Sequence, residues 1–165
     1  MEKAIVTGCP GSGKSVFARS LHEKTGLPLY PLDSLCWRPD RTMVPREIRL
    51  ETVLKILRTD RWIIDGNYGS TMELRMAFCD TVFFLDYPTE ICLQGVLARR
   101  GVKRPDLPWV EPADQTDTEF ITFVQNYNMH NRPIILQRLQ KLSGKEIYVF
   151  RTRSEADAFL ERCIE

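Results

Sequence analysis

The stretch Gly8-Cys9-Pro10-Gly11-Ser12-Gly13-Lys14-Ser15 is the most informative in the chain, because it matches the pattern G-x-x-x-x-G-K-[ST]. Glycines at these spacings allow successive backbone N–H groups to point into one concavity that holds phosphate oxygens. Lys14 adds a charge that reaches the β and γ phosphates, and the Ser15 hydroxyl is a ligand for Mg²⁺. The motif predicts binding of ATP with Mg²⁺. The residues expected to contact the nucleotide are Gly8, Pro10, Gly11, Ser12, Gly13, Lys14, Ser15 and Val16.

The residues on either side of this motif have the patterns of a strand and a helix. Ala4-Ile5-Val6-Thr7 is a short apolar run rich in β-branched residues, and Val16, Phe17 and Leu21 then follow near helical spacing. At background composition the motif arises by chance in on the order of one chain in a hundred. Its position between a predicted strand and a predicted helix is the context that a phosphate-binding loop requires, so an ordinary glycine-rich turn is disfavoured.

Apolar strands and helical segments alternate along the rest of the chain. Further strands are expected at 29–32, 62–64, 81–85 and 147–150, and helices at 45–57, 70–78, 88–100, 119–142 and 154–164. We expect Pro133 to bend the 119–142 helix and Ser154 to cap the last one. Continuous apolar strands separated by helices predict an α/β fold, a parallel sheet with helices on both faces. Such sheets bind ligands at the carboxyl ends of their strands.

Length and composition indicate a single globular domain spanning residues 1–165. The chain is 43% hydrophobic and 27% charged, with 23 Lys+Arg against 22 Asp+Glu and a net charge of +1. This balance gives no general attraction to nucleic acid or to an acidic membrane. No apolar run approaches the roughly 18–20 residues that span a bilayer. Five scattered cysteines without a C-x-x-C pair fit a cytoplasmic location.

Three further stretches resemble those of known proteins. They are Leu32-Asp33-Ser34-Leu35-Cys36-Trp37, Trp62-Ile63-Ile64-Asp65-Gly66-Asn67-Tyr68 and Leu85-Asp86-Tyr87-Pro88. Together with the glycine-rich loop they resemble the adenylate kinase-like P-loop kinases, most closely the family of DNA topology modulation proteins, over nearly the whole chain. The resemblance implies a three-layer P-loop NTPase fold, with five parallel strands in the order 2-3-1-4-5 and a small lid at about 101–118.

Two functions follow from this resemblance. The first is a kinase that transfers the γ-phosphoryl group of ATP to an unidentified small-molecule or nucleotide acceptor. The alternative is a nucleotide-binding regulatory protein that affects DNA topology, although the net charge of +1 does not favour nucleic-acid binding. A signalling GTPase is disfavoured, because the chain contains no N-K-x-D element for base recognition.

The resemblance assigns roles to two acidic residues. Asp33 is implied to contact the acceptor hydroxyl or a water on Mg²⁺, where a carboxylate can orient the hydroxyl and take its proton; a turn-capping role is the alternative. Asp65 takes the place of the acid that holds Mg²⁺, directly or through water, and Asp86 is its rival. We favour Asp65 because Asp65-Gly66 matches the D-G of adenylate kinases.

The sequence after Gly66 departs from that of adenylate kinases, which continue with phenylalanine, proline and arginine. Asn67-Tyr68-Gly69 stand there, so the arginine that grips phosphates is missing, which argues against a nucleoside monophosphate as acceptor. Arg75 is a candidate substitute, and a solvated surface arginine is the alternative. The residues expected to bind the acceptor are Asp33, Trp37, Asn67, Tyr68 and Arg75, with Trp109 as a further aromatic candidate.

Basic residues cluster just before the proline-rich segment 101–118. The resemblance implies that lid arginines approach the transferring phosphoryl group, so Arg99, Arg100 and Arg104 are candidate catalytic residues. Lys14 of the glycine-rich loop is the further candidate catalytic cation. The alternative is that these arginines only satisfy the last carbonyls of a helix. The lid acids Asp106, Glu111, Asp114, Asp117 and Glu119 are expected to neutralise the basic cluster when ATP is absent.

Arg151 and Arg153 follow the last predicted strand. The resemblance places this loop beside the adenine base, where an arginine can stack on the base face. The alternative is that the two arginines only flank the final helix.

Overall fold

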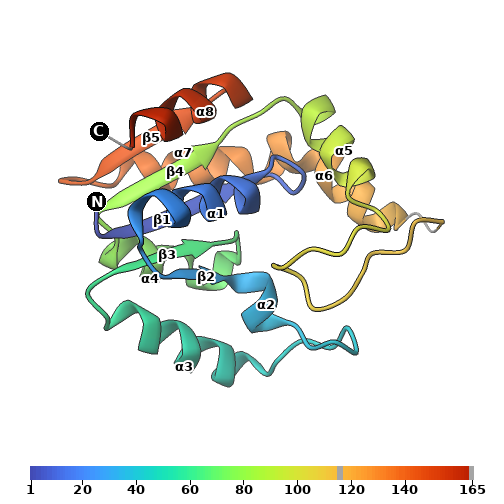
Figure 1. Cartoon of the computed structure of the whole chain (residues 1–165), viewed down its shortest axis with the longest axis horizontal. Helices are drawn as coiled ribbons and strands as arrows, with labels where there is room; N and C mark the ends of the chain where they lie inside the picture. Colours follow the sequence, from blue (N-terminus) through green and yellow to red (C-terminus); the bar gives the residue numbers. More distant parts are fainter. Residues whose placement is uncertain (115–116, 164–165) are drawn as a thin grey trace.

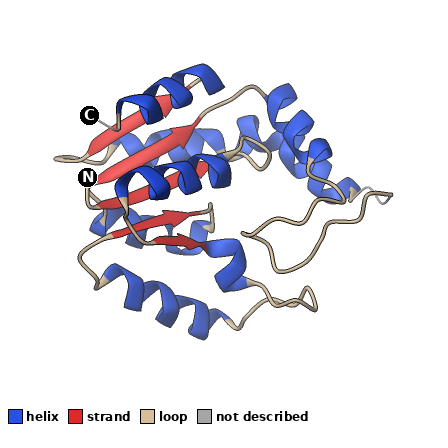
Figure 2. Cartoon of the chain, in the orientation of Figure 1, coloured by secondary structure: helices blue, strands red, loops and turns tan. Residues whose placement is uncertain are grey.

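The computed structural model describes residues 1–114 and 117–163, whose centre is a five-stranded parallel sheet in the order β2-β3-β1-β4-β5 (Figures 1 and 2). The strands are β1 (Lys3–Gly8), β2 (Leu29–Pro31), β3 (Trp62–Asp65), β4 (Thr81–Leu85) and β5 (Glu146–Phe150). The predicted α/β class, the parallel sheet and its strand order are confirmed.

Helices cover both faces of this sheet (Figure 2). They are α1 (Lys14–Thr25), α2 (Leu32–Cys36), α3 (Arg46–Leu57), α4 (Gly69–Phe78), α5 (Thr89–Ala98), α6 (Thr118–His130), α7 (Arg132–Gln140) and α8 (Arg153–Arg162). Alternate residues of β1 enter different cores: Ala4 and Val6 pack with α1 and α8, whereas Ile5 packs with α3, α4 and α7. Both faces are therefore buried, which is why the strand is a continuous apolar run.

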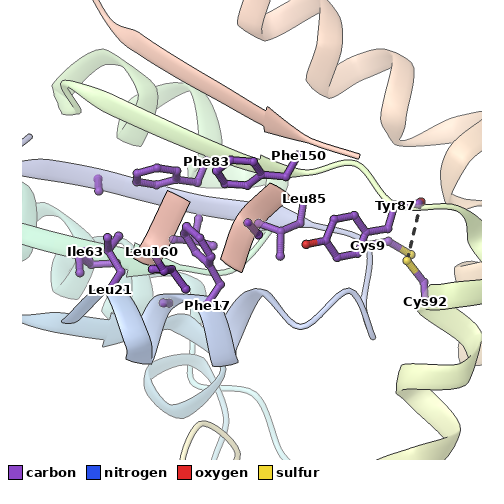
Figure 3. Close-up of a cluster of buried hydrophobic side chains, with 14 of the residues drawn as sticks. Cys9, Phe17, Leu21, Ile63, Phe83, Leu85, Tyr87, Cys92, Phe150 and Leu160 are labelled. Carbon is purple, nitrogen blue, oxygen red and sulfur yellow. Dashed lines mark hydrogen bonds between the residues drawn. The ribbon is translucent and has the colours of Figure 1, made fainter. Parts of the chain in front are cut away.

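The core beneath α1 and α8 is built on aromatic contacts (Figure 3). Phe17 of α1 lies against Phe83 of β4 and Phe150 of β5, with ring centroids 5.1 and 5.6 Å apart. Because Phe17 follows the glycine-rich loop by only a few residues, these contacts hold the start of α1 firmly on the sheet.

Three sequence-based expectations of secondary structure are corrected. The second strand ends at Pro31, and Leu32–Cys36 forms α2, so Asp33 lies in a helical turn beyond the sheet. The 119–142 segment forms two helices, and Pro133 lies in the first turn of α7, where its missing N–H is tolerated. Thr152 instead of Ser154 caps the last helix, because its hydroxyl accepts the Glu155 N–H at 3.3 Å.

The segment between α5 and α6 contains neither helix nor strand in its described part, 99–114 and 117. Residues 115–116 of the predicted lid lie outside the described residues. In Figure 1 this segment, coloured yellow, extends beyond the carboxyl ends of the strands on the side where α2 lies. We call it the lid. Within the described chain, none of the helices combines the length and the apolar character needed to cross a membrane.

Candidate nucleotide and acceptor site

The glycine-rich loop joins β1 to α1 and turns sharply between them. Gly11 and Gly13 have φ angles of +83° and +90°, a left-handed conformation that favours glycine. Gly13 is the residue before α1, so the free N–H groups of the first helical turn begin at Lys14. Ser12 has a buried hydroxyl with no hydrogen-bond partner among the described residues. This geometry fits a phosphate cradle at a helix N-terminus.

Asp65 ends β3 beside the loop, since it pairs in register with Val6 of β1. Its side chain is buried, and its Oδ1 has no hydrogen-bond partner in the described structure. Burial raises the pKa of this carboxyl to about 6, while the Lys14 charge and the Ser15 hydroxyl act in the opposite direction. Mg²⁺ prefers hard oxygen ligands, and a buried carboxylate oxygen that accepts no hydrogen bond, next to a serine hydroxyl, fits that preference.

Asp86, the rival to Asp65, lies at the end of β4 and has cationic partners. Arg132 holds both its oxygens, at 2.6 and 2.9 Å, and Arg151 donates to it at 3.1 Å. A carboxylate bound by two guanidinium groups has little capacity left for a metal ion. The geometry thus favours Asp65 over Asp86 as a magnesium ligand.

Two cavities meet at the glycine-rich loop. The smaller, about 330 Å³, lies between α1, α8 and the lid, and the larger, about 830 Å³, lies between α2, the loop after β3, the lid and α6. Lys14, Arg99 and Arg104 line both cavities. These three cations therefore stand at the junction, where a phosphoryl group passing from one cavity to the other would be.

Most of the residues predicted to bind the nucleotide line the smaller cavity. Gly11, Ser12, Gly13, Lys14, Ser15 and Val16 line it, together with Arg153 of α8. Pro10 lines the larger cavity, and the Gly8 N–H is donated to the Asn67 side chain at 3.2 Å. Arg151 lines neither cavity, because its guanidinium is bound to Asp86. The expectation that Arg151 stacks on the base is corrected accordingly.

The larger cavity contains four of the five residues predicted to bind the acceptor: Asp33, Trp37, Asn67 and Tyr68. The Tyr68 hydroxyl donates to Asp33 Oδ1 at 2.7 Å, which fixes the carboxylate. Asn67 Oδ1 accepts the Thr7 hydroxyl at 2.9 Å, so this asparagine ties the acceptor side to β1. Trp109 reaches the cavity from the lid.

Arg75 is the exception, and its predicted role is corrected. The side chain is fully buried and donates to the carbonyl oxygens of Gly66 at 2.8 Å, of Asn67, and of Tyr68 at 3.1 Å. Its Nε donates to the Thr71 hydroxyl at 3.1 Å. All three guanidinium nitrogens are engaged within the protein. Arg75 therefore shapes the loop that carries two acceptor-side residues, instead of facing the acceptor itself.

The lid cations are paired with lid acids, as predicted for two of those acids. Arg99 lies 2.9 Å from Glu111, and Arg104 lies 3.3 Å from Glu111 and 2.9 Å from Asp106. Asp106 is buried and also binds Arg19 of α1 at 3.1 Å. Asp106 thereby holds the lid on α1.

The remaining lid residues have other roles. Asp117 caps α6, because its carboxylate accepts the Phe120 N–H at 2.9 Å. Arg100 lines the larger cavity only. Of the three lid arginines, Arg99 and Arg104 alone line both cavities.

Several residues at the two cavities were not identified from the sequence. Arg19 follows Lys14 by more than one helical turn, and nothing local distinguishes it from a surface arginine. Arg41 lines the larger cavity from a turn with a φ of +65°. Phe120 shares the helical spacing of the core residue Val124 but lines the cavity. Helical periodicity identifies a buried face, yet it does not distinguish a core from a cavity wall.

Comparisons with known proteins support the fold. No family model matches the chain, and no curated protein sequence matches it. A crystal structure of shikimate kinase from Bacteroides thetaiotaomicron is similar to it, with a TM-score of 0.62 and 15% identity, over 96% of this chain and 94% of that one. At this identity the likeness concerns the fold alone.

Proposed function

We propose that the chain is an ATP- and Mg²⁺-dependent kinase that phosphorylates a hydroxyl group of a small molecule. The observation that carries this proposal is the meeting of two cavities at Lys14, Arg99 and Arg104, beside the buried carboxylate of Asp65. Two chambers with shared cations at their junction suit the transfer of an anionic group between two bound molecules. The fold shared with a shikimate kinase supports the same class of reaction.

Each residue has a physical task in this proposal. The loop N–H groups and Lys14 bind the phosphates, and Asp65 and Ser15 would hold Mg²⁺, which neutralises charge on the phosphate oxygens. Asp33, oriented by Tyr68, accepts the proton of the acceptor hydroxyl. Arg99 and Arg104 leave Glu111 for the phosphoryl oxygens, where planar guanidinium groups stabilise developing charge.

The test measures ADP release from MgATP, with and without a pool of nucleosides, nucleoside monophosphates and small hydroxyl compounds that includes shikimate. Lys14→Ala should lower stimulated turnover by about 10²-fold or more, because the junction loses its central cation. Lys55→Ala, on an exposed part of α3, is the matched control. Asp33→Asn should lower turnover much more than ATP affinity, with exposed Asp60→Asn as its control.

Two results would count against this assignment. Unchanged turnover in Lys14→Ala would remove the loop from the mechanism. Tight ATP binding with no stimulation by any pool member would favour the alternative, a nucleotide-binding regulator of DNA topology. DNA binding across a salt series would then be measured, because binding through phosphate contacts weakens steeply as salt rises.

A further inference from the structure

The larger cavity is walled by aromatic side chains from four separate parts of the chain. Trp37 follows α2, Tyr68 precedes α4, Trp109 belongs to the lid, and Phe120 lies in the first turn of α6. All four are half-buried, so each presents part of its surface to the cavity. Phe120 also packs against the core beneath α1 and α8, and Trp37 and Tyr68 pack against the opposite core, so these rings line the cavity where the two cores reach it.

The lid and the acceptor side of the cavity touch through two of these rings. Trp37 and Trp109 meet edge to face, with centroids 5.5 Å apart and planes at 76°. This contact joins the segment after α2 to the lid across the cavity mouth. A ligand that contacts either indole therefore also influences how the lid rests on the acceptor side.

The cavity also carries polar side chains, among them Arg41, Arg100 and Glu111. Asp33 lines it, fixed by Tyr68, and the junction cations Lys14, Arg99 and Arg104 line both this cavity and the nucleotide cavity. A polyol would place some of its hydroxyl groups against the faces of these rings, which offer no conventional hydrogen bond, and unpaired buried hydroxyls are costly. A planar ring instead covers aromatic faces favourably.

We propose that the acceptor is a hydroxyl compound that carries a planar aromatic or heteroaromatic ring. The ring packs on Trp37 and Trp109, and the hydroxyl points to Asp33. A volume of about 830 Å³ accommodates such a molecule with the lid in its present position. The transfer step rests on the proposed function, whereas the ring binding does not.

The transfer step forms one bond to phosphorus and breaks another. The acceptor hydroxyl oxygen forms a bond to the γ-phosphorus of ATP, and the bond from that phosphorus to the β–γ bridging oxygen breaks. ADP carries away the bonding electron pair as the leaving group. Asp33 accepts the hydroxyl proton and releases it to water. No oxidant or reductant is required.

Tryptophan fluorescence tests ring binding separately from catalysis. The chain has three tryptophans; Trp37 and Trp109 line the cavity, and Trp62 is fully buried in the core. Two probe sets are titrated in the presence of MgADP. The first contains alcohols that bear an aromatic or heteroaromatic ring, here called ring-bearing probes (the common nucleosides, benzyl alcohols and pyridine alcohols), and the second contains non-aromatic alcohols (ribose, inositol and shikimate). We expect saturable fluorescence changes only with ring-bearing probes, and none in a Trp37→Phe/Trp109→Phe double variant, whose remaining signal comes from Trp62.

Affinity measurements identify the wall that binds the ring. Trp37→Ala and Trp109→Ala should each weaken the bound probe about tenfold or more, measured by calorimetry, whereas Trp37→Phe retains most of the affinity. Val110→Ala, an exposed neighbour of Trp109 that does not line the cavity, is the matched control. ADP release is then measured with the same probes.

The outcomes separate this inference from the proposed function. Saturable fluorescence change by ring-bearing probes, with no ADP release by any probe, would support ring binding and contradict the kinase. Stimulated ADP release by shikimate or another non-aromatic alcohol alone would support the kinase and overturn the ring inference. No saturable change with any ring-bearing probe, or equal affinity in both alanine variants, would also overturn it.

Discussion

Replacing Gly95 with alanine is expected to push the glycine-rich loop away from α5. A Cβ at this position would lie 2.0 Å from the Gly11 carbonyl oxygen and 2.9 Å from the Gly11 carbonyl carbon. Both atoms are backbone, so neither can rotate aside. Real Cβ atoms essentially never approach closer than 3.0 Å, so the loop or the helix must move by at least about 1 Å. The displaced element is the phosphate cradle itself.

Two opposing effects set the change in the free energy of unfolding that Gly95→Ala causes. Alanine in a helix interior is favoured over glycine by roughly 0.5–1 kcal/mol, so a helix-propensity argument predicts that Gly95→Ala stabilises the protein. Overpacking of a tight contact costs typically about 1–3 kcal/mol. Gly69 in the first turn of α4 provides the control, since a Cβ there meets nothing within 4 Å. We expect Gly95→Ala to be less stable than Gly69→Ala by about 1–3 kcal/mol.

Urea unfolding followed by circular dichroism measures this difference, and turnover provides a second readout. A shift of about 1 Å in the position of catalytic groups lowers the rate on the order of 100-fold. Because Gly95→Ala displaces the glycine-rich loop, this variant should turn over slowly even when it is fully folded. If the two alanine variants are equally stable and turn over ATP equally, α5 does not support the loop, and the reasoning is refuted.

Three further predictions concern buried or paired charges. Since burial raises the pKa of Asp65 to about 6, the contribution of this group to stability should be fully present below about pH 4 and should be lost as pH rises through 6. Urea unfolding in EDTA should therefore find Asp65→Asn more stable than the parent at pH 8 by up to about 3 kcal/mol, with a smaller advantage at pH 5; an equal advantage at the two pH values would contradict the reasoning. Arg75→Lys should cost about 2–4 kcal/mol in the same assay, because a single ammonium nitrogen cannot reproduce the planar fork whose three nitrogens reach three carbonyls and the Thr71 hydroxyl, whereas Arg61→Lys in an exposed ion pair should change little; equal effects would refute the role of Arg75. Glu111→Gln removes the acidic partner of Arg99 and one of the two acidic partners of Arg104, so calorimetry at low salt should find tighter MgATP binding, with the advantage shrinking as salt rises; unchanged affinity would show that the pairs do not compete with phosphate.

Much of the fold was predictable from local patterns. The apolar runs at 62–64 and 81–85 lie within strands that are buried on both faces, so their hydrophobicity was visible without any knowledge of their partners. The loop at Gly11 and Gly13 was predictable for a similar reason, since these glycines adopt positive φ angles that the local turn requires and that other residues disfavour. The extent of β2 was not predictable, because the chain turns at Pro31 into a helix whose stability comes from packing of Leu32 and Cys36 in the core.

The sequence by itself determined the phosphate cradle, the alternation of strands and helices, and the acidic and aromatic residues that gather beyond the strand ends. Only the tertiary structure decided how the charges are used. Asp65 and Asp86 both end a strand, yet only Asp86 is neutralised by arginines, which come from α7 and the segment after β5. Arg75 is polar in sequence and fully buried in the fold, where it serves loop carbonyls. The physical reason is that hydrophobic pattern and turn chemistry act between neighbours, whereas the pairing of a charge depends on which distant segments the fold brings within about 3 Å.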